Sequence, residues 1–253
     1  MRRHLILVAI LVAMFLAIPL RGCISIPGGF PIIGPRPEVT GSPNIAKWEY
    51  EFTDFTNINV SSAFTVYISR SKSHYVRITA NENLLDYLNV YQRGDTLYIG
   101  LKRGRYKNVT CEAIIDLPSL LGLELSGASK GDISCCPKFS TSNPLKLRLS
   151  GASRVSGSIE AGDCTFNLSG ASTIELAGSG NDADINASGA SEVDLSEFPI
   201  NDVKVTLSGA SDATLNLYGK LDANLRSASH LKYIGEPTLG SIKTSEGSTV
   251  SKP

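Results

Sequence analysis

The sequence predicts an all-β protein built as a parallel β-helix, or β-solenoid, with about 19 to 20 residues per repeat. Three observations lead to this fold class. The word Ser-Gly-Ala-Ser behind an apolar residue returns through the second half of the 253-residue chain. Between its copies, apolar and polar residues alternate as in half-buried strands, and no segment there has the i, i+3, i+4 spacing of a helix. A fixed period of this length is typical of stacked repeats that share one core.

The copies of the word are almost evenly spaced. Aligned on the first Ser position, successive copies lie 24, 19, 19, 20, 18 and 19 residues apart. At ~3.3 Å per residue, a 19-residue unit traces roughly 60 Å, which suits one coil with short straight sides. A propeller blade needs about twice that length, so a propeller is disfavoured. The copies occupy residues 125–129, 149–153, 168–172, 187–191 and 207–211, with altered versions at 225–229 and 244–248.

The small residues of the word predict a structural ladder. Gly and Ala leave room where a coil turns, and stacked Ser hydroxyls can bond to neighbouring backbone or to each other. A nucleophilic serine is the competing interpretation. That motif is Gly-x-Ser-x-Gly followed by a helix, and an enzyme needs one copy rather than five, so we predict no catalytic residue. The ladder comprises Ser126, Gly127, Ser150, Gly151, Ser169, Gly170, Ser188, Gly189, Ser208 and Gly209.

The first half of the chain has strand-like segments in a less regular order. Residues 81–87 fit a single helical turn, and residues 92–95 fit a turn between strands. Trp48, Tyr50 and Phe52 alternate with charged residues, so they should share one face of an opening strand. We expect this face to cover the exposed end of the core rather than to bind a sugar. The strand-like segments are residues 55–60, 64–68, 75–79 and 96–99.

The N-terminus has the features of an export signal. A basic start at residues 1–4 precedes an uncharged apolar run at residues 5–20. Because this run is shorter than the ~20 residues that cross a bilayer, we assign residues 1–22 to a signal peptide. An uncleaved N-terminal anchor and plain secretion are the alternatives. In each case the folded part lies outside the cytoplasm.

A membrane anchor and a tether are predicted directly after the signal. Residues 20–23 resemble a bacterial lipobox in which Cys23 is the lipidated residue, with Arg21 as an unusual occupant. Residues 23–46 are rich in Pro and Gly and should extend as a tether. Residues 47–253 then form one elongated domain, since a solenoid grows by stacking. We therefore expect a membrane-anchored, extracytoplasmic protein of a bacterial cell envelope.

The sequence also predicts one disulfide. A gap-free alignment of the units that end at Ser126 and Ser150 places Cys111 over Cys135. Stacked strands lie ~4.8 Å apart, inside the range of about 4.4 to 6.8 Å between Cα atoms that a disulfide tolerates. Such a bridge would stabilise the fold by roughly 3 kcal/mol, and Cys136 is the alternative partner. A zinc site needs four converging ligands, and no His lies near these cysteines in the sequence, so we expect no metal.

Carboxylates decorate the repeats beside the apolar strand residues. We expect them on the solvated outer face, where they hinder pairing with other chains. The alternatives are a calcium site at residues 180–184 and a polysaccharide-cleaving site assembled by folding. The calcium-binding nonapeptide pattern is absent from the sequence, and no Asp has the Arg or Lys nearby that a lyase needs. The residues are Asp182, Asp184, Asp194, Asp202, Asp212 and Asp222.

The charge pattern argues against nucleic acid as a partner. The formal net charge is +0, and Lys and Arg are scattered except at residues 102–107. We expect that short cluster to be a solvated loop, with contact to anionic lipid or polysaccharide as the alternative. No motif indicates a cofactor.

Several segments together resemble a known family, the putative auto-transporter adhesin head GIN domain, which is also a domain of unknown function. The resemblance covers about residues 47 to 253. It implies a right-handed, single-stranded β-helix in bacterial envelope or surface proteins, and it brings no catalytic residues. It is carried by the repeated Leu-Ser-Gly-Ala-Ser and by residues 55–58, 64–66, 82–85, 95–99, 115–118 and 246–250.

These observations predict a non-enzymatic cell-envelope protein that acts in binding, adhesion or structure. Its expected partners are the membrane, through an N-terminal lipid or uncleaved anchor, and envelope polysaccharide or protein. A homo-oligomer is a further expectation. A polysaccharide-acting lyase or hydrolase on the same β-helix is the alternative function.

Overall fold

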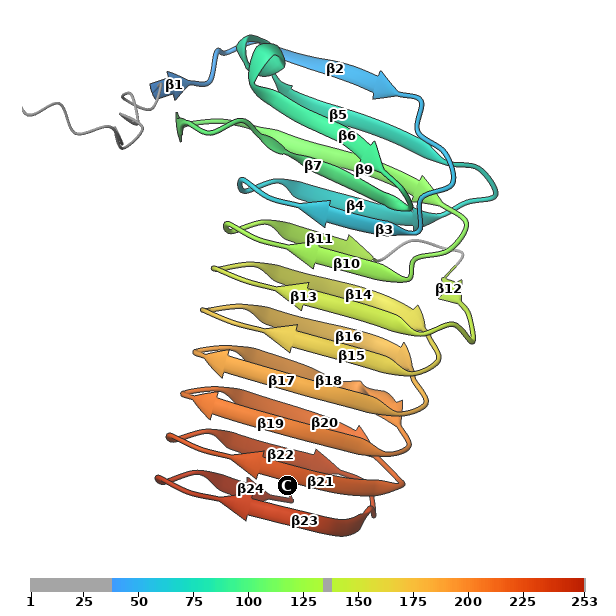
Figure 1. Ribbon diagram of the computed structural model, residues 1–253, viewed down its shortest axis with the longest axis vertical. Coiled ribbons are helices and arrows are strands. Elements are labelled where there is room, and N and C mark those ends of the chain that lie inside the picture. Colours follow the sequence, from blue (N-terminus) through green and yellow to red (C-terminus); the bar gives the residue numbers. More distant parts are fainter. Residues whose placement is uncertain (1–37, 134–137, 253) are drawn as a thin grey trace, which may run out of the picture. The chain divides into compact units, whose positions relative to one another are not determined.

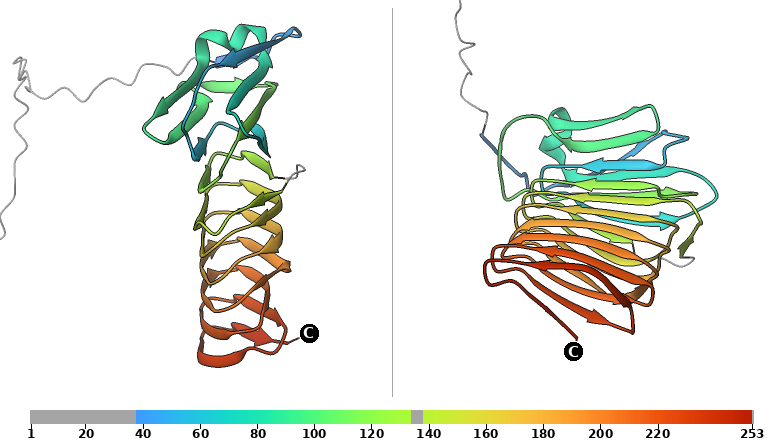
Figure 2. Two further views of the ribbon diagram at one scale, coloured as in Figure 1. Left: turned by 90° about the vertical axis from the view of Figure 1, so that its right-hand side faces the viewer. Right: turned by 60° about the horizontal axis from the view of Figure 1, so that its bottom comes forward.

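The computed structural model describes residues 38–133 and 138–252. These residues form the predicted all-β fold, a parallel β-solenoid of about 6 turns with ~20 residues per turn. Each coil of the regular part contributes one strand to each of two sheets, a 10-stranded and a 12-stranded one (Figure 1). Figure 2 shows the coils stacked along a single axis, with the two sheets as opposite walls.

The regular part runs from residue 122 to residue 251. Each strand pairs in parallel with the strand one coil away, so that Leu147 lies between Leu123 and Phe166 in register. Equivalent residues therefore stack in columns along the solenoid. The short β12 (Phe139–Ser140) also pairs with β14. The two strands of each coil are β10 (Gly122–Leu125) and β11 (Lys130–Ile133), β13 (Leu145–Leu149) and β14 (Arg154–Glu160), β15 (Cys164–Leu168) and β16 (Thr173–Ser179), β17 (Ala183–Gly189) and β18 (Glu192–Ile200), β19 (Val203–Gly209) and β20 (Asp212–Leu217), β21 (Lys220–Leu225) and β22 (His230–Ile234), and β23 (Thr238–Thr244) and β24 (Thr249–Ser251).

The core lies between the two sheets and follows from strand alternation. In β13, Leu145, Leu147 and Leu149 are buried, whereas Lys146 and Arg148 are exposed. Similar alternation in the coils before β23 joins the buried apolar side chains of the described residues into one continuous cluster. Burying each such side chain contributes about 1.5 to 3 kcal/mol, so the stack is held mainly by this column of apolar residues.

The N-terminal coils are not stacked in chain order. The coil of β3 (Asn57–Val60) and β4 (Thr65–Arg70) lies between the later coil of β7 (Thr96–Leu101) and β9 (Cys111–Leu117) on one side and β10 and β11 on the other. After the β3–β4 coil, the chain therefore forms the neighbouring coil on one side and then crosses over to form β10 and β11 on the other side. Sequence periodicity does not predict this order, because periodicity shows which residues face the core and not which coils are neighbours.

This topology separates the strand of Cys111 from the strands that follow it in the chain. Cys111 opens β9, whose neighbours are β4 and β5, and β4 separates it from β11. The disulfide from Cys111 to Cys135 or Cys136 stays a prediction. Cys135 and its alternative Cys136 lie outside the described residues. Among the residues that are described, Cys111 and Cys164 are buried and form no disulfide.

Antiparallel strands close the N-terminal end of both sheets. β5 (Tyr75–Asn81) pairs with β9 and with the edge strand β2 (Ile45–Tyr50), and β6 (Leu88–Arg93) forms a hairpin with β7. The 3-10 helix η1 (Glu82–Tyr87) connects β5 and β6 at the predicted helical turn. Trp48 and Tyr50 are half-buried and pack against the core with Phe52. These aromatic residues therefore cover the end of the core.

Strands begin before residue 47. β1 (Glu38–Thr40) pairs with β8 (Arg105–Lys107), and β2 starts at Ile45, so part of the segment assigned to the tether is regular structure. Residues 1–37, which hold the predicted signal and Cys23, lie outside the described residues. In the part of the chain that is described, no helix is long and apolar enough to cross a membrane.

Candidate functional site

The Ser-Gly-Ala-Ser word forms the turn that leads from the 10-stranded sheet to the 12-stranded one. The glycine of each copy has a positive φ, +78° at Gly170 and +86° at Gly189, a conformation that favours glycine. A Cβ built on Gly189 would lie 2.5 Å from the carbonyl oxygen of Gly170 in the preceding coil. That carbonyl accepts a hydrogen bond from the Ala190 N–H at 2.7 Å. The glycines thus lie where stacked turns leave no room for a side chain.

The first serine of the word is only loosely bonded. Ser188 Oγ lies 3.3 Å from the Leu168 carbonyl oxygen, and Ser169 Oγ lies 3.5 Å from that of Leu149. These distances are long for hydroxyl donors. The first serines are partly exposed and form a column on the outer face of the 10-stranded sheet. They retain hydrogen-bonding capacity toward solvent or a ligand.

The second serine of the word, which the sequence analysis did not single out, closes each turn from inside. Ser191 is 1 % exposed, and its Oγ donates to the Ser188 carbonyl oxygen at 2.9 Å. One signal in the sequence could have revealed this role, since the altered copy at residues 226–229 keeps only its Ala and its last Ser. Ser229 there donates to Arg226 O at 2.8 Å. The equivalent bonds are made by Ser129, Ser153, Ser172 and Ser211.

A second set of outward side chains, which we call the polar column, runs across the 10-stranded sheet. Its members are register partners on neighbouring strands, so each lies one strand spacing, ~4.8 Å, from the next. Within the described residues, Glu124, Arg148 and Thr206 make no side-chain hydrogen bond or ion pair with the protein. The polar column consists of Tyr98, Asn59, Glu124, Arg148, Asn167, Asn186, Thr206 and Asn224.

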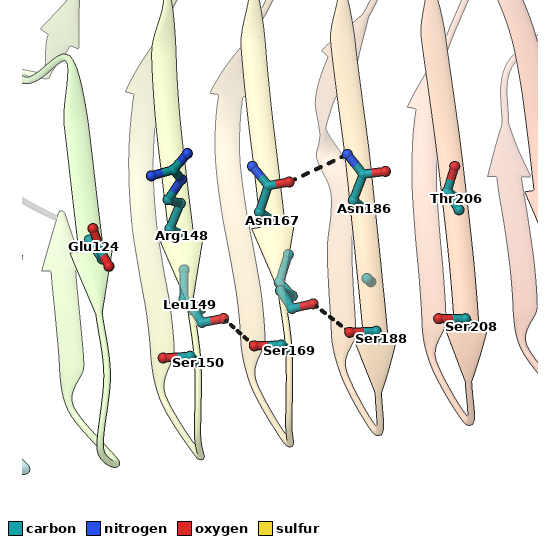
Figure 3. A pocket seen from close by; sticks show the side chains of 12 residues that line it. Glu124, Arg148, Leu149, Ser150, Asn167, Ser169, Asn186, Ser188, Thr206 and Ser208 are labelled. Atoms are coloured by element: carbon teal, nitrogen blue, oxygen red, sulfur yellow. Dashed lines mark hydrogen bonds between the residues drawn. The ribbon is translucent and has the colours of Figure 1, made fainter.

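A groove of about 440 Å³ lies between the polar column and the column of first serines. Figure 3 shows both columns side by side, with the serines nearer the turns. Asn186 Nδ2 lies 3.4 Å from Asn167 Oδ1, a weak contact within the column. Leu149 and Leu168 border the groove through their backbone, because their side chains are buried. The groove therefore presents hydroxyl, amide, guanidinium and carboxylate groups along its edges, together with apolar surface.

A smaller hollow of about 160 Å³ continues from the groove toward the N-terminal coils. Its lining shares Glu124 and Arg148 with the groove and adds Lys146 and Tyr98. The ring of Tyr98 is stacked on that of Tyr91, with centroids 4.8 Å apart and planes 6° from parallel. The polar column thus ends in an aromatic pair.

The outer face of the 12-stranded sheet has a different charge. A hollow of about 270 Å³ there is lined by Glu175, Asp194 and Glu197 together with Ser156 and Ser196. Among the residues that the structure describes, no group of three or more His, Cys, Asp or Glu is placed to hold a metal ion. The two faces of the solenoid therefore offer different chemistry, one mixed and hydrogen-bonding, the other acidic.

Three of the outer-face carboxylates have a structural partner. Oδ1 of Asp182, Asp202 and Asp222 accepts the backbone N–H of a residue one coil later, at 3.1, 2.7 and 2.6 Å. The Lys220 side chain and then the Ser241 N–H lower the pKa of Asp222. Asp182, which belongs to the proposed calcium segment 180–184, has its Oδ1 engaged by Asn201 Nδ2 as well. These carboxylates link neighbouring coils.

The two described cysteines are buried thiols. Burial raises the pKa of Cys111 to about 11. Burial and, to a lesser extent, the nearby Asp163 raise the pKa of Cys164 to about 12. The thiolate is the reactive form of cysteine, so neither residue is suited to nucleophilic or redox chemistry at neutral pH.

Solved structures with the same fold come from Bacteroides and Parabacteroides species. A putative adhesin from Bacteroides fragilis NCTC 9343 has a TM-score of 0.75 and 18% identity, with 85% of this chain and 100% of that chain covered. A putative lipid binding protein from Parabacteroides distasonis ATCC 8503 has a TM-score of 0.68, 20% identity and coverage of 85% and 99%. A putative adhesin from Parabacteroides merdae ATCC 43184 has a TM-score of 0.64, 18% identity and coverage of 86% and 99%.

Sequence comparison identifies the family. No curated protein matches the chain. The family model described as putative auto-transporter adhesin, head GIN domain, matches residues 54–237, which is more than half of the chain. The chain therefore belongs to the putative auto-transporter adhesin, head GIN domain family.

Proposed function

We propose that the protein is a non-enzymatic adhesion module of a bacterial cell envelope, and that the outer face of the 10-stranded sheet is its binding surface. The observation that carries this proposal is the polar column. Its side chains stand in register on consecutive strands, and Glu124, Arg148 and Thr206 have no partner among the described residues. Family membership adds support, because the family description names an adhesin.

The arrangement of the polar column favours binding over catalysis. Catalytic sites bring a nucleophile, a base and a stabilising group to within hydrogen-bond distance of one reacting atom. The polar column instead spreads its side chains along a line, one on each strand. Such a line suits many weak contacts with a long ligand, each repeated from coil to coil.

The N-terminal signal and Cys23 support a location outside the cytoplasm on a membrane. In this proposal, Cys23 carries the lipid, the segment before β1 acts as the tether, and the solenoid projects away from the membrane. An extended stack of coils then presents a long lateral face to other envelope or surface components.

The test measures retention of the full chain on cell-envelope material. Replacing Asn167 and Asn186 together by Ala should reduce retention at least severalfold. The matched control replaces Thr173 and Glu192, register neighbours on the other sheet in the same two coils, and should retain binding. Equal retention by both double variants would overturn the assignment of the surface. Catalytic release of sugars from the material would replace the proposal with the enzyme alternative.

A further inference from the structure

We propose that the ligand of the polar column is an extended acidic polysaccharide that lies across the strands, parallel to the solenoid axis. This inference rests on the proposed function and names the ligand class of the same surface. It joins the groove, the smaller hollow and the aromatic pair into one continuous site.

The repeat of the surface points to a repeating ligand. The polar column offers a new set of donors and acceptors at each strand, ~4.8 Å apart. In an extended sugar chain, consecutive rings follow at a comparable distance, and each ring carries hydroxyls that accept and donate hydrogen bonds. The column of Ser150, Ser169, Ser188 and Ser208 lines the same groove. One ring per coil could therefore bond to an amide or charged group on one side and a hydroxyl on the other.

The backbone and the lining disfavour peptide and lipid. A peptide that extends a sheet needs a free strand edge, whereas each strand from β7 to β21 in the 10-stranded sheet has a neighbour on both sides. An acyl chain needs an enclosed apolar pocket, whereas this groove is open and has polar side chains along both edges. Leu149 and Leu168, the largest apolar residues at the groove, are only 2% and 3% exposed. A sugar polymer suits a surface with hydroxyl and amide groups.

The tyrosine pair provides a platform at one end of the site. Tyr98 lines the smaller hollow, and Tyr91 stacks behind it. An aromatic ring in this position can pack against the C–H face of a sugar ring, while the Tyr hydroxyl stays hydrated. The cross-strand register of Tyr91 and Tyr98 holds the platform rigidly at the start of the polar column.

The charges favour an acidic polymer over a neutral one. Lys146 and Arg148 both line the smaller hollow, and one carboxylate, Glu124, lies between them and the N-terminal coils. The exposed Arg148 guanidinium makes no ion pair within residues 38–133 and 138–252, so both of its donor edges can hold a carboxylate in a bidentate pair. The acidic hollow at Glu175 repels the same polymer from the opposite sheet. The charges thus select one face.

The experiment measures binding of the full chain to polygalacturonate, with dextran as the neutral polymer and anionic lipid vesicles as the lipid surface. We expect binding to polygalacturonate that weakens with added salt, and none to dextran or vesicles. Arg148→Gln should weaken binding about tenfold or more, since it removes a charge-assisted pair. The control Arg154→Gln removes the same charge from β14 in the same coil and should change affinity less than about twofold. Circular dichroism of both variants verifies that they are folded.

The outcomes separate this inference from the proposed function. Arg148→Gln and Arg154→Gln with equal affinity would place the polymer elsewhere and overturn the inference. Binding to dextran as tight as to polygalacturonate, or binding to vesicles alone, would overturn the ligand class. If no polymer binds while the Asn167/Asn186 variant still loses retention on envelope material, the ligand class is wrong and the binding surface stands. Loss of neither would overturn both.

Discussion

The glycine in each Ser-Gly-Ala-Ser turn is required for two independent physical reasons. Its φ is positive, and at Gly170, Gly189 and Gly209 an added Cβ would overlap the carbonyl of the glycine one coil earlier. We expect Gly189→Val to lower the free energy of unfolding by roughly 1 to 3 kcal/mol, through backbone strain and the clash with Gly170. Urea unfolding monitored by circular dichroism measures this change. The control Asp194→Ala, on the outer face of the other sheet, should cost under about 0.5 kcal/mol.

The two serines of the word should differ in the same experiment. Ser191→Ala removes a buried donor and leaves the Ser188 carbonyl short of a partner, so we expect a loss of about 1 to 2 kcal/mol. Ser188→Ala should cost about 0.5 kcal/mol, because its hydroxyl is partly exposed and its bond to Leu168 O is long. Equal and negligible losses at Gly189, Ser188 and Ser191 would contradict the structural role of the word. The Ser-Gly-Ala-Ser word would then form an exposed surface that is kept for binding rather than for stability.

The buried thiol of Cys164 predicts a loss of stability at alkaline pH. The folded state holds the proton to a pKa of about 12, whereas the unfolded chain releases it near the ordinary value of 9.0. Below pH 9 both states keep the proton and the full stability is present. Between pH 9 and about 12 only the unfolded chain ionises, so stability falls as pH rises. The urea midpoint of the native chain should therefore decline across this range.

A matched variant isolates the contribution of the thiol. Cys164→Ala places at this position the residue that its register partner Ala183 already has. Its urea midpoint should decline less steeply with pH, because tyrosines and lysines titrate alike in both proteins. Identical alkaline profiles for the native chain and the variant would contradict the assignment to Cys164.

At the level of single elements, the strands of the repeats could be predicted from sequence and their partners could not always be. Alternation in β13 to β21 shows which residues face the core, and the spacing of the word fixes the register of neighbouring coils. In the N-terminal coils the order of the strands departs from the order of the chain. The β3–β4 coil separates β9 from β11, so the coil that precedes β10 in the sequence is not its neighbour in the stack.

The candidate site was only partly predictable for a related reason. The serine column belongs to the repeated word and is visible in the sequence. Four of the eight members of the polar column are Asn and the other four are all different, so no regular repeat marks it. Tyr98 and Asn59 join Glu124 only because β7 and β3 precede β10 in the sheet. Likewise, the hydrogen bond from the Lys220 N–H to Asp202 Oδ1 depends on the register of the turns at the other end of each coil, which lead back to the 10-stranded sheet.

At the scale of the whole molecule, the solenoid separates two surfaces on one rigid core. The 10-stranded sheet carries the polar column with Arg148, and the 12-stranded sheet carries the acidic hollow with Glu175. Since the buried column between them is continuous, a substitution on one face leaves the other intact. This independence is what makes Arg154 a valid control for Arg148.

Where the chain is held decides whether this face can reach a surface ligand. If Cys23 is lipidated, Cys23→Ser should move the protein from the membrane to the soluble fraction, and the mature native protein should carry the added mass of a lipid that the variant lacks. Fractionation and intact mass spectrometry measure the two effects. The Cys164→Ala variant, which also removes one thiol, should stay with the membrane. Membrane retention of Cys23→Ser with an intact N-terminus would instead show that the apolar run at residues 5–20 is an uncleaved anchor.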